Sequence, residues 1–265
     1  MKKRVVIEKC VGETPLMALQ RWKQVNPAYK SVPASYAGRL DPMARGKLLV
    51  LLGEECKKQK AYTGLDKEYE IEVLLDAGSD TGDALGLVKY AHKETRMGQG
   101  ALREALRAEL GTHLRAYPQF SSKTVGGKPL FLHALEGGIS AINIPKHEEH
   151  IYRIKVQEIA TISSAALAVR LHEFLARVPK SSEPSKLLGA DFRIGDVRAS
   201  WERLFAEAGE RNFTVISLRI ACGSGTYMRS FAGRIGETLG TQGLALSINR
   251  TRIGTYWKGW WIKSF

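Results

Sequence analysis

Cysteines are scarce in this 265-residue sequence, and no Cys-x-x-Cys pair is present. The three cysteines, Cys10, Cys56 and Cys222, lie far apart, which argues against a disulfide framework or a zinc site. Apolar runs are also short: no segment approaches the roughly 18–20 residues that a membrane-spanning helix needs. Only residues 5–7 are apolar before Glu8, too few for the core of a signal peptide. We therefore expect reduced thiols and a cytoplasmic location.

Acidic residues are outnumbered by basic ones. The sequence has 27 Asp and Glu against 40 Lys and Arg, a formal net charge of +13. Such a charge attracts polyanions over long distances. The basic residues are scattered rather than concentrated on one amphipathic helix, which argues against a membrane surface. With 44% hydrophobic residues the chain can still bury a core, so we expect a globular protein whose partner is a nucleic acid.

Hydrophobic periodicity predicts both helices and strands in the first half of the chain. Thr14-Pro15 is a typical helix start, and the apolar spacing after it predicts a helix at 15–25. The apolar run at 48–52 predicts a buried strand that follows a loop at 36–46. Strict alternation at 67–75 predicts a half-buried strand with Tyr69 facing inward. The sequence thus places the 36–46 loop next to a core strand.

The second half mixes the same patterns with more glycine and proline. Leucines at four-residue steps predict a helix at 99–110, whereas 115–150 is irregular and contains one short helix near 129–136. The remaining expectations are strands at 150–160, 166–178, 213–222 and 244–249, a surface loop at 179–200, and a helix at 227–239. Runs of strands with helices between them predict an α+β fold with one sheet. The irregular segment at 115–150 is predicted to leave that sheet and return to it.

Asp41 lies between Leu40 and Pro42, just before the predicted core strand. An Asp-Pro pair often does no more than form a turn, and local chemistry alone favours that interpretation. A carboxylate held by rigid backbone at the end of a core element is also a typical position for a functional group. The two interpretations cannot be separated from these three residues.

The surrounding residues add a more specific signal. Residues 38–50, Gly-Arg-Leu-Asp-Pro-Met-Ala-Arg-Gly-Lys-Leu-Leu-Val, resemble the Gly-x-Leu-Asp-Pro-x-Ala-x-Gly-x-Leu segment of the TruB family of tRNA pseudouridine synthases. Residues 9–14 and 52–57 are similar to the motifs that flank this segment in the family. Further similar blocks follow in the same order at 66–69, 80–86, 118–123, 127–130, 225–229 and 250–254. The resemblance covers residues 9–254 and is thinnest at 155–210.

The resemblance to this family implies an architecture. The expected fold is the α+β pseudouridine synthase fold, with a mixed, mainly antiparallel central sheet flanked by helices. The resemblance identifies the irregular segment at about 115–150 as a thumb-like RNA-binding insertion. It further implies a catalytic domain at 1–254, followed by a short tail at 255–265 with no separate C-terminal RNA-binding domain.

The resemblance also implies a reaction and its catalytic residues. The enzyme would convert a uridine in the T-loop of tRNA, position 55, to pseudouridine, with the base flipped out of its stack. No redox step occurs, so neither a cofactor nor a metal is expected. Asp41 would be the nucleophile, Arg229 its ion-pair partner, and Tyr69 a residue that stacks on the base or takes the C5 proton. The expected partner is the T-arm of tRNA, bound by a monomer without a protein partner.

Other residues are expected to bind the substrate. Tyr227 and Ile248 would contact the target nucleotide. Tyr36 occupies a position where the family usually has histidine. Arg39 occupies a position where the family usually has a small residue or threonine. Because of these two differences, the sequence does not determine which side chains contact the flipped base. Core packing remains the alternative for Tyr69, Tyr227 and Ile248. The basic residues expected to contact RNA are Lys9, in the first motif, and Lys57, Lys58, Lys60, Arg115, Lys123, Lys128 and Arg250.

Three rival interpretations remain open. Asp76, Asp80 and Asp83 could form a hard-metal site, although the further glutamate of a calcium loop is missing. The glycine-containing segment 223–226 could cradle a phosphate at a helix N-terminus, although it lacks the P-loop pattern. The third rival is a non-catalytic RNA-binding protein or tRNA-folding chaperone with the same fold. Retention of Asp41 together with its predicted partners argues against that rival.

Overall fold

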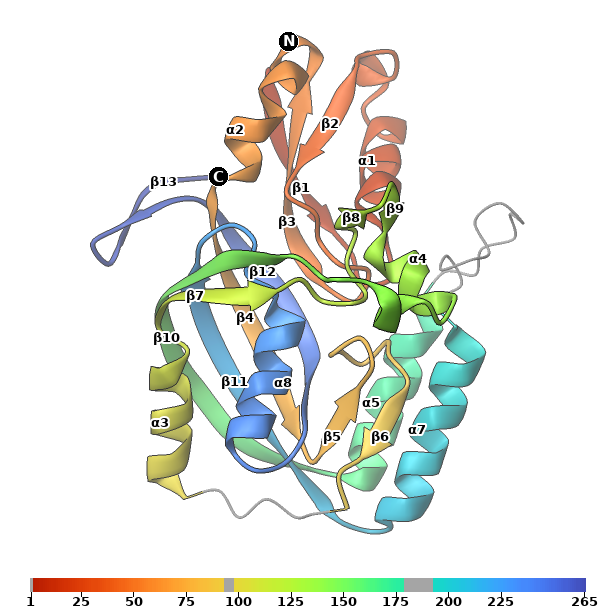
Figure 1. Cartoon of the computed structure of the whole chain (residues 1–265). Helices are drawn as coiled ribbons and strands as arrows, with labels where there is room; N and C mark the ends of the chain where they lie inside the picture. The colour runs from red at the N-terminus through yellow and green to blue at the C-terminus, as the bar shows by residue number, and fades with distance from the viewer. Residues whose placement is uncertain (1, 93–97, 179–192) are drawn as a thin grey trace.

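A nine-stranded sheet forms the centre of the molecule in the computed structural model, which describes residues 2–92, 98–178 and 193–265. The strands run in the order β1-β3-β12-β4-β11-β10-β7, with β2 beside β3 and β13 beside β12 (Figure 1). Their bounds are β1 Arg4–Lys9, β2 Ala34–Ala37, β3 Arg45–Leu52, β4 Asp66–Leu75, β7 Gly111–Ala116, β10 Lys146–Ser163, β11 Asn212–Cys222, β12 Gly243–Trp257 and β13 Trp260–Ser264. All pairings are antiparallel except a short parallel contact between β3 and β12. The predicted mixed, mainly antiparallel sheet is confirmed.

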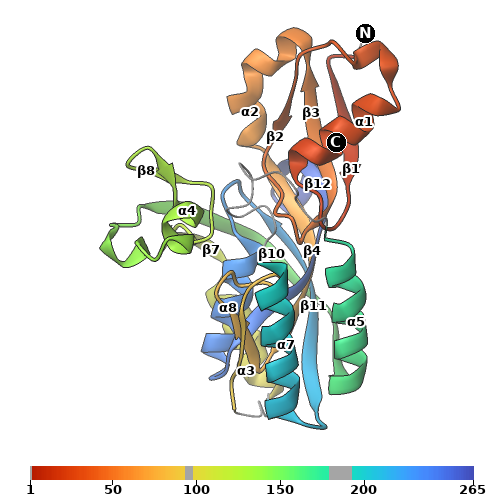
Figure 2. The same ribbon diagram turned by 90° about the vertical axis from the view of Figure 1, so that its right-hand side faces the viewer.

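Helices pack against this sheet and supply its core. Figure 2 shows α5 and α8 on opposite sides of the sheet, with α1 beside the strands at the top of the view. The main core includes fully buried Phe231 of α8 and Ile71 of β4, and a smaller cluster joins Leu19 of α1 to Leu48 of β3. The α-helices are α1 Pro15–Gln24, α2 Gln59–Thr63, α3 Gln99–Ala108, α4 Leu130–Leu135, α5 Ser164–Ala176, α7 Ile194–Ala208 and α8 Met228–Thr238. The 3-10 helices and short strands are η1 Pro27–Tyr29, η2 Gly53–Lys58, η3 Ile139–Ala141, β5 Ala77–Ser79, β6 Val88–Tyr90, β8 Thr124–Val125 and β9 Lys128–Pro129.

Most predicted elements are present. The helix at 15–25 is α1, whose start is capped by the Thr14 hydroxyl accepting from the Met17 amide at 3.2 Å. The alternation at 67–75 is strand β4, and Tyr69 faces the core with 8% exposure. The predictions at 48–52, 99–110, 129–136, 150–160, 213–222 and 227–239 likewise correspond to β3, α3, α4, β10, β11 and α8.

Two predictions were wrong. The segment 166–178, expected to be a strand, belongs to helix α5, whose buried side chains Leu167, Leu171 and Leu175 recur at four-residue intervals. The loop expected at 179–200 overlaps α7, which begins at Ile194, while residues 179–192 lie outside the described part of the chain. In α7, as in α5, the buried side chains recur at helical spacing, at Val197, Trp201 and Leu204.

The irregular segment leaves the sheet between two paired strands. Strands β7 and β10 are antiparallel neighbours, and the Tyr117 amide donates to the Pro145 carbonyl at 3.1 Å where the segment begins and ends. Between these residues the chain forms α4 and the β8–β9 hairpin, which extend to one side of the body in Figure 2. The fully buried Leu130 anchors α4. The excursion is therefore a folded projection with both ends fixed to the sheet.

The C-terminal residues extend the sheet. Strand β12, predicted only at 244–249, continues to Trp257, and β13 pairs back onto it through a turn at Lys258-Gly259. Both turn residues have positive φ, 46° and 90°, as two-residue hairpin turns of the primed type require. Residues 255–265, expected to be a tail, thus contain the β13 hairpin. Among the residues that the structure describes, no helix is long and apolar enough to traverse a lipid bilayer.

Candidate active site

A cavity of 690 Å³ opens where the loop after β2 meets β4, β12, the start of α8 and the base of the 117–145 projection. It brings together residues that are up to 236 positions apart in the sequence, from Thr14 to Arg250. Eight of the predicted site residues line it: Tyr36, Arg39, Asp41, Tyr69, Tyr227, Arg229, Ile248 and Arg250. Lys9, Lys57 and Lys128 do not. The resemblance therefore selected residues that the fold does assemble around one cavity.

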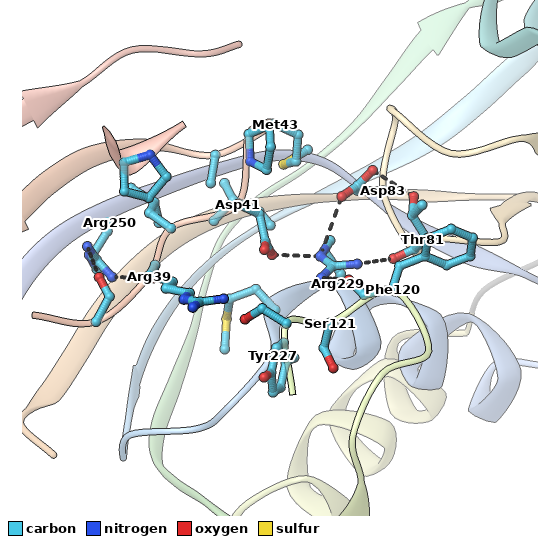
Figure 3. A pocket seen from close by; sticks show the side chains of 18 of the residues that line it. Arg39, Asp41, Met43, Thr81, Asp83, Phe120, Ser121, Tyr227, Arg229 and Arg250 are labelled. Atoms are coloured by element: carbon cyan, nitrogen blue, oxygen red, sulfur yellow. Dashed lines mark hydrogen bonds and ion pairs between the residues drawn. The ribbon is translucent and has the colours of Figure 1, made fainter. Parts of the chain in front are cut away.

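Asp41 and Arg229 form an ion pair in this cavity. The Arg229 Nε donates to Asp41 Oδ2 at 2.6 Å (Figure 3). The two side chains differ in exposure: that of Asp41 is 38% exposed, whereas that of Arg229 is 4% exposed. The carboxylate is thus accessible from the cavity, while its partner is covered by protein. This geometry keeps the carboxylate in a fixed orientation.

Arg229 is held by more than Asp41. Its two Nη atoms donate to the backbone carbonyls of Thr81, at 2.6 Å, and Phe120, at 3.1 Å. Asp83 approaches the same Nε as Asp41, with 3.5 Å between Nε and the Asp83 Oδ2 (Figure 3). Burial opposes the charge of Arg229, but Asp41 and Asp83 together raise its pKa above the ordinary value. Arg229 is therefore a permanent cation with a fixed position.

Asp83 is a site residue to which the sequence assigned no role beyond the alternative metal site. It is 4% exposed, and its carboxylate accepts from the Thr81 hydroxyl at 2.8 Å and the Leu85 amide at 2.9 Å. Burial raises its pKa to about 6, with Arg229 acting in the opposite direction. In the sequence, only the position of Asp83 in the block at 80–86, which resembles the family, indicated a role in the site.

Two buried cations support the loop that carries Asp41. Lys9 is completely buried, and its Nζ donates to the carbonyls of Cys10 at 2.9 Å, Pro42 at 3.3 Å and Ala44 at 2.5 Å. Burial lowers the pKa of Lys9 to about 8. Lys9 was expected to bind substrate; because all of it is enclosed by protein, it fixes the loop instead.

Arg250 resembles Lys9 in its contacts. It is 1% exposed and donates to the carbonyls of Lys47 at 2.7 Å and Arg39 at 3.0 Å. Although it lines the cavity, its guanidinium is engaged by backbone, which corrects the expectation of a phosphate contact. Lys57 and Lys128 are on the surface, paired with Glu54 at 2.5 Å and with Glu136, respectively. Neither lies at the cavity.

Two tyrosines, of which Tyr69 is buried and Tyr227 half-buried, and a buried isoleucine form the apolar part of the cavity. Tyr69 on β4 and Ile248 on β12 are 8% and 4% exposed. Burial raises the pKa of Tyr69 to about 12, and burial followed by the charge of Asp41 does the same for Tyr227. Both phenols are therefore protonated at neutral pH. They offer ring faces and hydroxyl donors rather than a base.

An aromatic cluster that the sequence did not predict joins the projection to α8. Tyr117, at the base of the projection, stacks on His147 with ring centroids 4.0 Å apart. Both rings meet the edge of Tyr227, at 6.3 and 5.8 Å. The position of Tyr227 in the cavity is thus coupled to the strands that carry the projection.

The alternative sites predicted from sequence are not formed. Asp76 pairs with Arg211, and Asp80 pairs with Arg193 at 2.7 Å, so the three aspartates do not converge. Within the described ranges no group of three His, Cys, Asp or Glu side chains could hold a metal ion. The arrangement therefore gives no support to a metal site.

The glycine-containing segment 223–226 is part of the main cavity rather than a separate phosphate cradle. At the start of α8, the Tyr227 amide donates to the carboxylate of Glu149 at 3.4 Å. Glu149 is 2% exposed. A buried carboxylate beside the helix N-terminus repels a phosphate there, and this weakens the nucleotide-binding alternative.

The fold and the site together define a protein class. The structure of a Cbf5-Nop10-Gar1 complex matches 94% of this chain and 48% of the other, with a TM-score of 0.54 and 17% sequence identity. The chain has the pseudouridine synthase fold. More specifically, residues 27–173 match the TruB family pseudouridylate synthase N-terminal domain, and the chain belongs to that family.

Curated relatives agree with this assignment. The tRNA pseudouridine synthase B of Aromatoleum aromaticum is 29% identical over 252 residues, 95% of this chain and 63% of the relative. That of Deinococcus radiodurans is 29% identical over 221 residues, 83% of this chain and 65% of the relative. The chain thus spans slightly less than two thirds of the length of these two proteins.

Proposed function

We propose that this protein isomerises a uridine of tRNA to pseudouridine, and that Asp41 is the nucleophile. The observation that carries the proposal is the geometry of Asp41: a half-exposed carboxylate at an apolar cavity, ion-paired with a buried arginine. The names of the curated relatives give the reaction class. Following the family resemblance, we take the substrate to be the uridine at position 55 in the T-loop.

The chemistry suits a carboxylate. When the N1–C1′ bond breaks, its electron pair leaves with the uracil, and a carboxylate oxygen of Asp41 bonds to C1′. After the uracil has turned, C5 attacks C1′ and displaces the carboxylate, and the C5 proton is then lost while N1 gains one. The overall change is an isomerisation, so atoms and electrons balance without an external reagent. Arg229 holds the carboxylate in one orientation before attack.

The apolar residues would hold the base during this sequence. A uracil that detaches from the sugar must stay in the cavity, and Tyr69 and Ile248 provide a ring face and an aliphatic surface for it. The pKa of Tyr69, raised to about 12 by burial, favours a stacking role over removal of the C5 proton by a phenolate. Tyr36 and Arg39 line the outer part of the cavity and would contact the flipped nucleotide.

Charge and shape favour RNA as the partner. The net charge of +13 attracts the phosphate backbone, and the 117–145 projection lies beside the cavity where it can grip the T-arm. We therefore keep the division into a catalytic unit at 1–254 with an RNA-binding insertion. A cytoplasmic monomer without cofactor or metal stays a prediction.

The test is tritium release from tRNA labelled with 5-³H-uridine, because the C5 hydrogen is lost only when the base is rejoined through carbon. We expect Asp41→Asn to lower release by about 10³-fold or more, as removal of a nucleophile does in other enzymes. Asp196→Asn, the same change on the exposed start of α7, is the matched control and should leave the rate unchanged.

Two results would decide against the proposal. If Asp41→Asn releases tritium as fast as the parent, Asp41 is not the nucleophile. If parent and variant bind tRNA equally well but neither releases tritium, the protein is an RNA-binding protein or tRNA-folding chaperone instead.

A further inference from the structure

The β12–β13 hairpin presents two large aromatic rings to solvent that the proposed reaction does not use. Trp257 and Trp260 face each other across the two strands and are 59% and 77% exposed. Lys258 and Gly259 form the tight turn between them, so the two rings are held on a short, ordered hairpin. Figure 1 shows this hairpin projecting from the sheet. Exposed tryptophans in such a position indicate a binding surface.

A row of aromatic rings runs from the hairpin onto strand β10. Trp261 meets Tyr256 with ring centroids 5.2 Å apart, Tyr256 meets Tyr152 at 5.2 Å, and Tyr152 meets His150 at 4.4 Å. These four rings form an unbroken row from β13 to β10. A second cavity of 580 Å³ adjoins the row, lined by His150, Tyr152, Tyr256 and Trp257 among others. Trp257 and Trp260 form the next cross-strand pair after Tyr256 and Trp261, so their rings lie on the opposite face of the hairpin from the row. The two faces meet at the second cavity, which both Tyr256 and Trp257 line. We call the row together with Trp257 and Trp260 the aromatic surface.

The charge around this surface is positive. Residues 251–265 include three exposed basic residues, Arg252, Lys258 and Lys263, and no acidic one; Arg252 is paired with Glu68 at 3.4 Å. Lys258 and the exposed Arg153 line the second cavity. The nearby carboxylate of Asp66 is engaged, accepting from the Tyr152 hydroxyl at 2.9 Å and the Tyr256 amide at 2.8 Å. Aromatic rings among cations are the usual features of a single-stranded nucleic acid site.

The aromatic surface adjoins the catalytic cavity. Gly223 lines that cavity, and its amide donates to the His150 carbonyl at 2.8 Å. A Cβ placed on Gly223 would lie 3.6 Å from the His150 Cβ and 3.7 Å from the Tyr152 hydroxyl. Only a residue without a side chain thus separates the two sites. An RNA strand whose uridine enters the first cavity can continue directly over the second.

We propose that unpaired nucleotides of the RNA substrate, outside the target uridine, stack on the aromatic surface. The inference rests on the proposed function, because it takes the RNA to be the substrate of the neighbouring cavity. Tryptophan rings bind bases of any identity through their faces, and Lys258 and Arg153 provide the phosphate contacts. The surface contributes affinity and register for the RNA, and no step of the isomerisation.

Steady-state tritium release and tRNA binding test this proposal together. We expect Trp257→Ala and Trp260→Ala each to raise KM and the Kd for tRNA about 10-fold with kcat unchanged, as loss of one stacked base predicts. Phe at either position should restore most of the affinity because it keeps a ring face. Ile262→Ala, which removes an exposed apolar side chain of the same hairpin, should change neither constant.

A second measurement separates RNA from a protein partner. Lys258→Ala should reduce the slope of log Kd against log salt by about 0.7, the value for one phosphate contact of a single strand. If both tryptophan variants bind and turn over tRNA like the parent, the inference is overturned while the proposed function remains. If instead the hairpin variants dissociate a dimer seen by sedimentation and Ile262→Ala does the same, the surface is an interface with a second copy, and the inference is likewise overturned.

Failure of the proposed function would have a different result. In that case the protein would release no tritium. A uridine oligonucleotide would still quench the tryptophan fluorescence of the parent by binding to the aromatic surface. The double variant, Trp257→Ala with Trp260→Ala, would lose this quenching.

Discussion

Replacing Lys9 by methionine should separate the stability of the protein from its activity. The Lys9 ammonium donates to three carbonyls: those of Pro42 and Ala44, which directly follow Asp41 in the loop, and that of Cys10. Methionine has a similar length and no donor, so Lys9→Met removes the three hydrogen bonds without leaving a large cavity. The loop would lose its support while the core around it stays filled.

Two opposing terms determine the effect on stability. Burial lowers the pKa of Lys9 from 10.5 to about 8, which corresponds to about 3 kcal/mol of unfavourable free energy for the charged form in the folded state. Against this, each carbonyl left without a donor costs about 1–3 kcal/mol, and the two shorter bonds therefore cost about 2–6 kcal/mol. Near pH 7 the two terms largely cancel, and we expect the free energy of unfolding of the variant to lie between about 1 kcal/mol above and about 3 kcal/mol below that of the parent.

The pH dependence identifies the buried charge. Because the folded-state pKa lies below the unfolded one, the unfolded chain binds more protons between pH 8 and 10.5, and the parent becomes more stable as the pH rises through that range. The Lys9→Met variant lacks this gain. The difference in free energy of unfolding, parent minus variant, should thus increase by about 3 kcal/mol between pH 7.5 and 10.5. Urea unfolding at several pH values measures it.

Activity should respond differently from stability. A displacement of Asp41 by about 1 Å is enough to lower the rate of an oriented reaction about 10²-fold, so kcat for tritium release should fall by about 10–100-fold in Lys9→Met at pH 7. Lys23→Met is the matched control, because Lys23 also donates to a loop carbonyl, that of Val32 at 2.7 Å, away from Asp41. If Lys9→Met keeps the parent kcat and shows no change of the stability difference with pH, the proposed support of the loop is refuted.

Two further predictions concern the same framework. Gly46→Ala should lower the free energy of unfolding, measured by urea titration, by about 3 kcal/mol or more, because φ is +113° and the new Cβ would lie 2.4 Å from the Arg250 carbonyl oxygen. Gly111→Ala is the control for backbone strain alone, because Gly111 has φ +90° and no atom within 4 Å of the new Cβ. For Asp83→Asn, urea unfolding from pH 4 to 7 should show the parent losing about 2 kcal/mol relative to the variant between pH 4 and 6, since a folded-state pKa of about 6 exceeds the ordinary 3.8 and the charged form is disfavoured. A constant difference over that range would contradict the assigned burial of this charge.

Local patterns were sufficient for most of the fold. Strand β4 could be predicted because its alternation is strict, and α1 because capping and periodicity coincide at Thr14-Pro15. Helix α5 was missed although its N-cap is present: the Ser163 hydroxyl accepts from the Ala166 amide at 3.2 Å. The apolar residues of 166–178 fit an alternating pattern as well as a helical one, and only the packing decides, with Leu171 buried and Val169 62% exposed.

The cavity was predictable only as a set of motifs. Which motif residues reach the cavity depends on contacts between distant parts of the chain, and such contacts leave no local signal. Lys9 and Arg250 illustrate the difficulty, because lysine and arginine are mostly exposed residue types yet both are enclosed here. Asp83 is the converse case: a carboxylate in a turn-like segment that becomes buried when α8 brings Arg229 against it.

The two interpretations of Asp41 that the local sequence left open turn out to be compatible. Asp41 does form a turn, since its carbonyl accepts from the Ala44 amide at 3.0 Å. That turn is fixed to Lys9 through Pro42 and Ala44, and its carboxylate meets an arginine 188 positions further along the chain. A turn that only reversed the chain would need neither contact, because Asp-Pro forms turns on unsupported surface loops as well. The support beneath the turn is therefore what separates a positioned carboxylate from an ordinary turn residue, and Lys9→Met tests it directly.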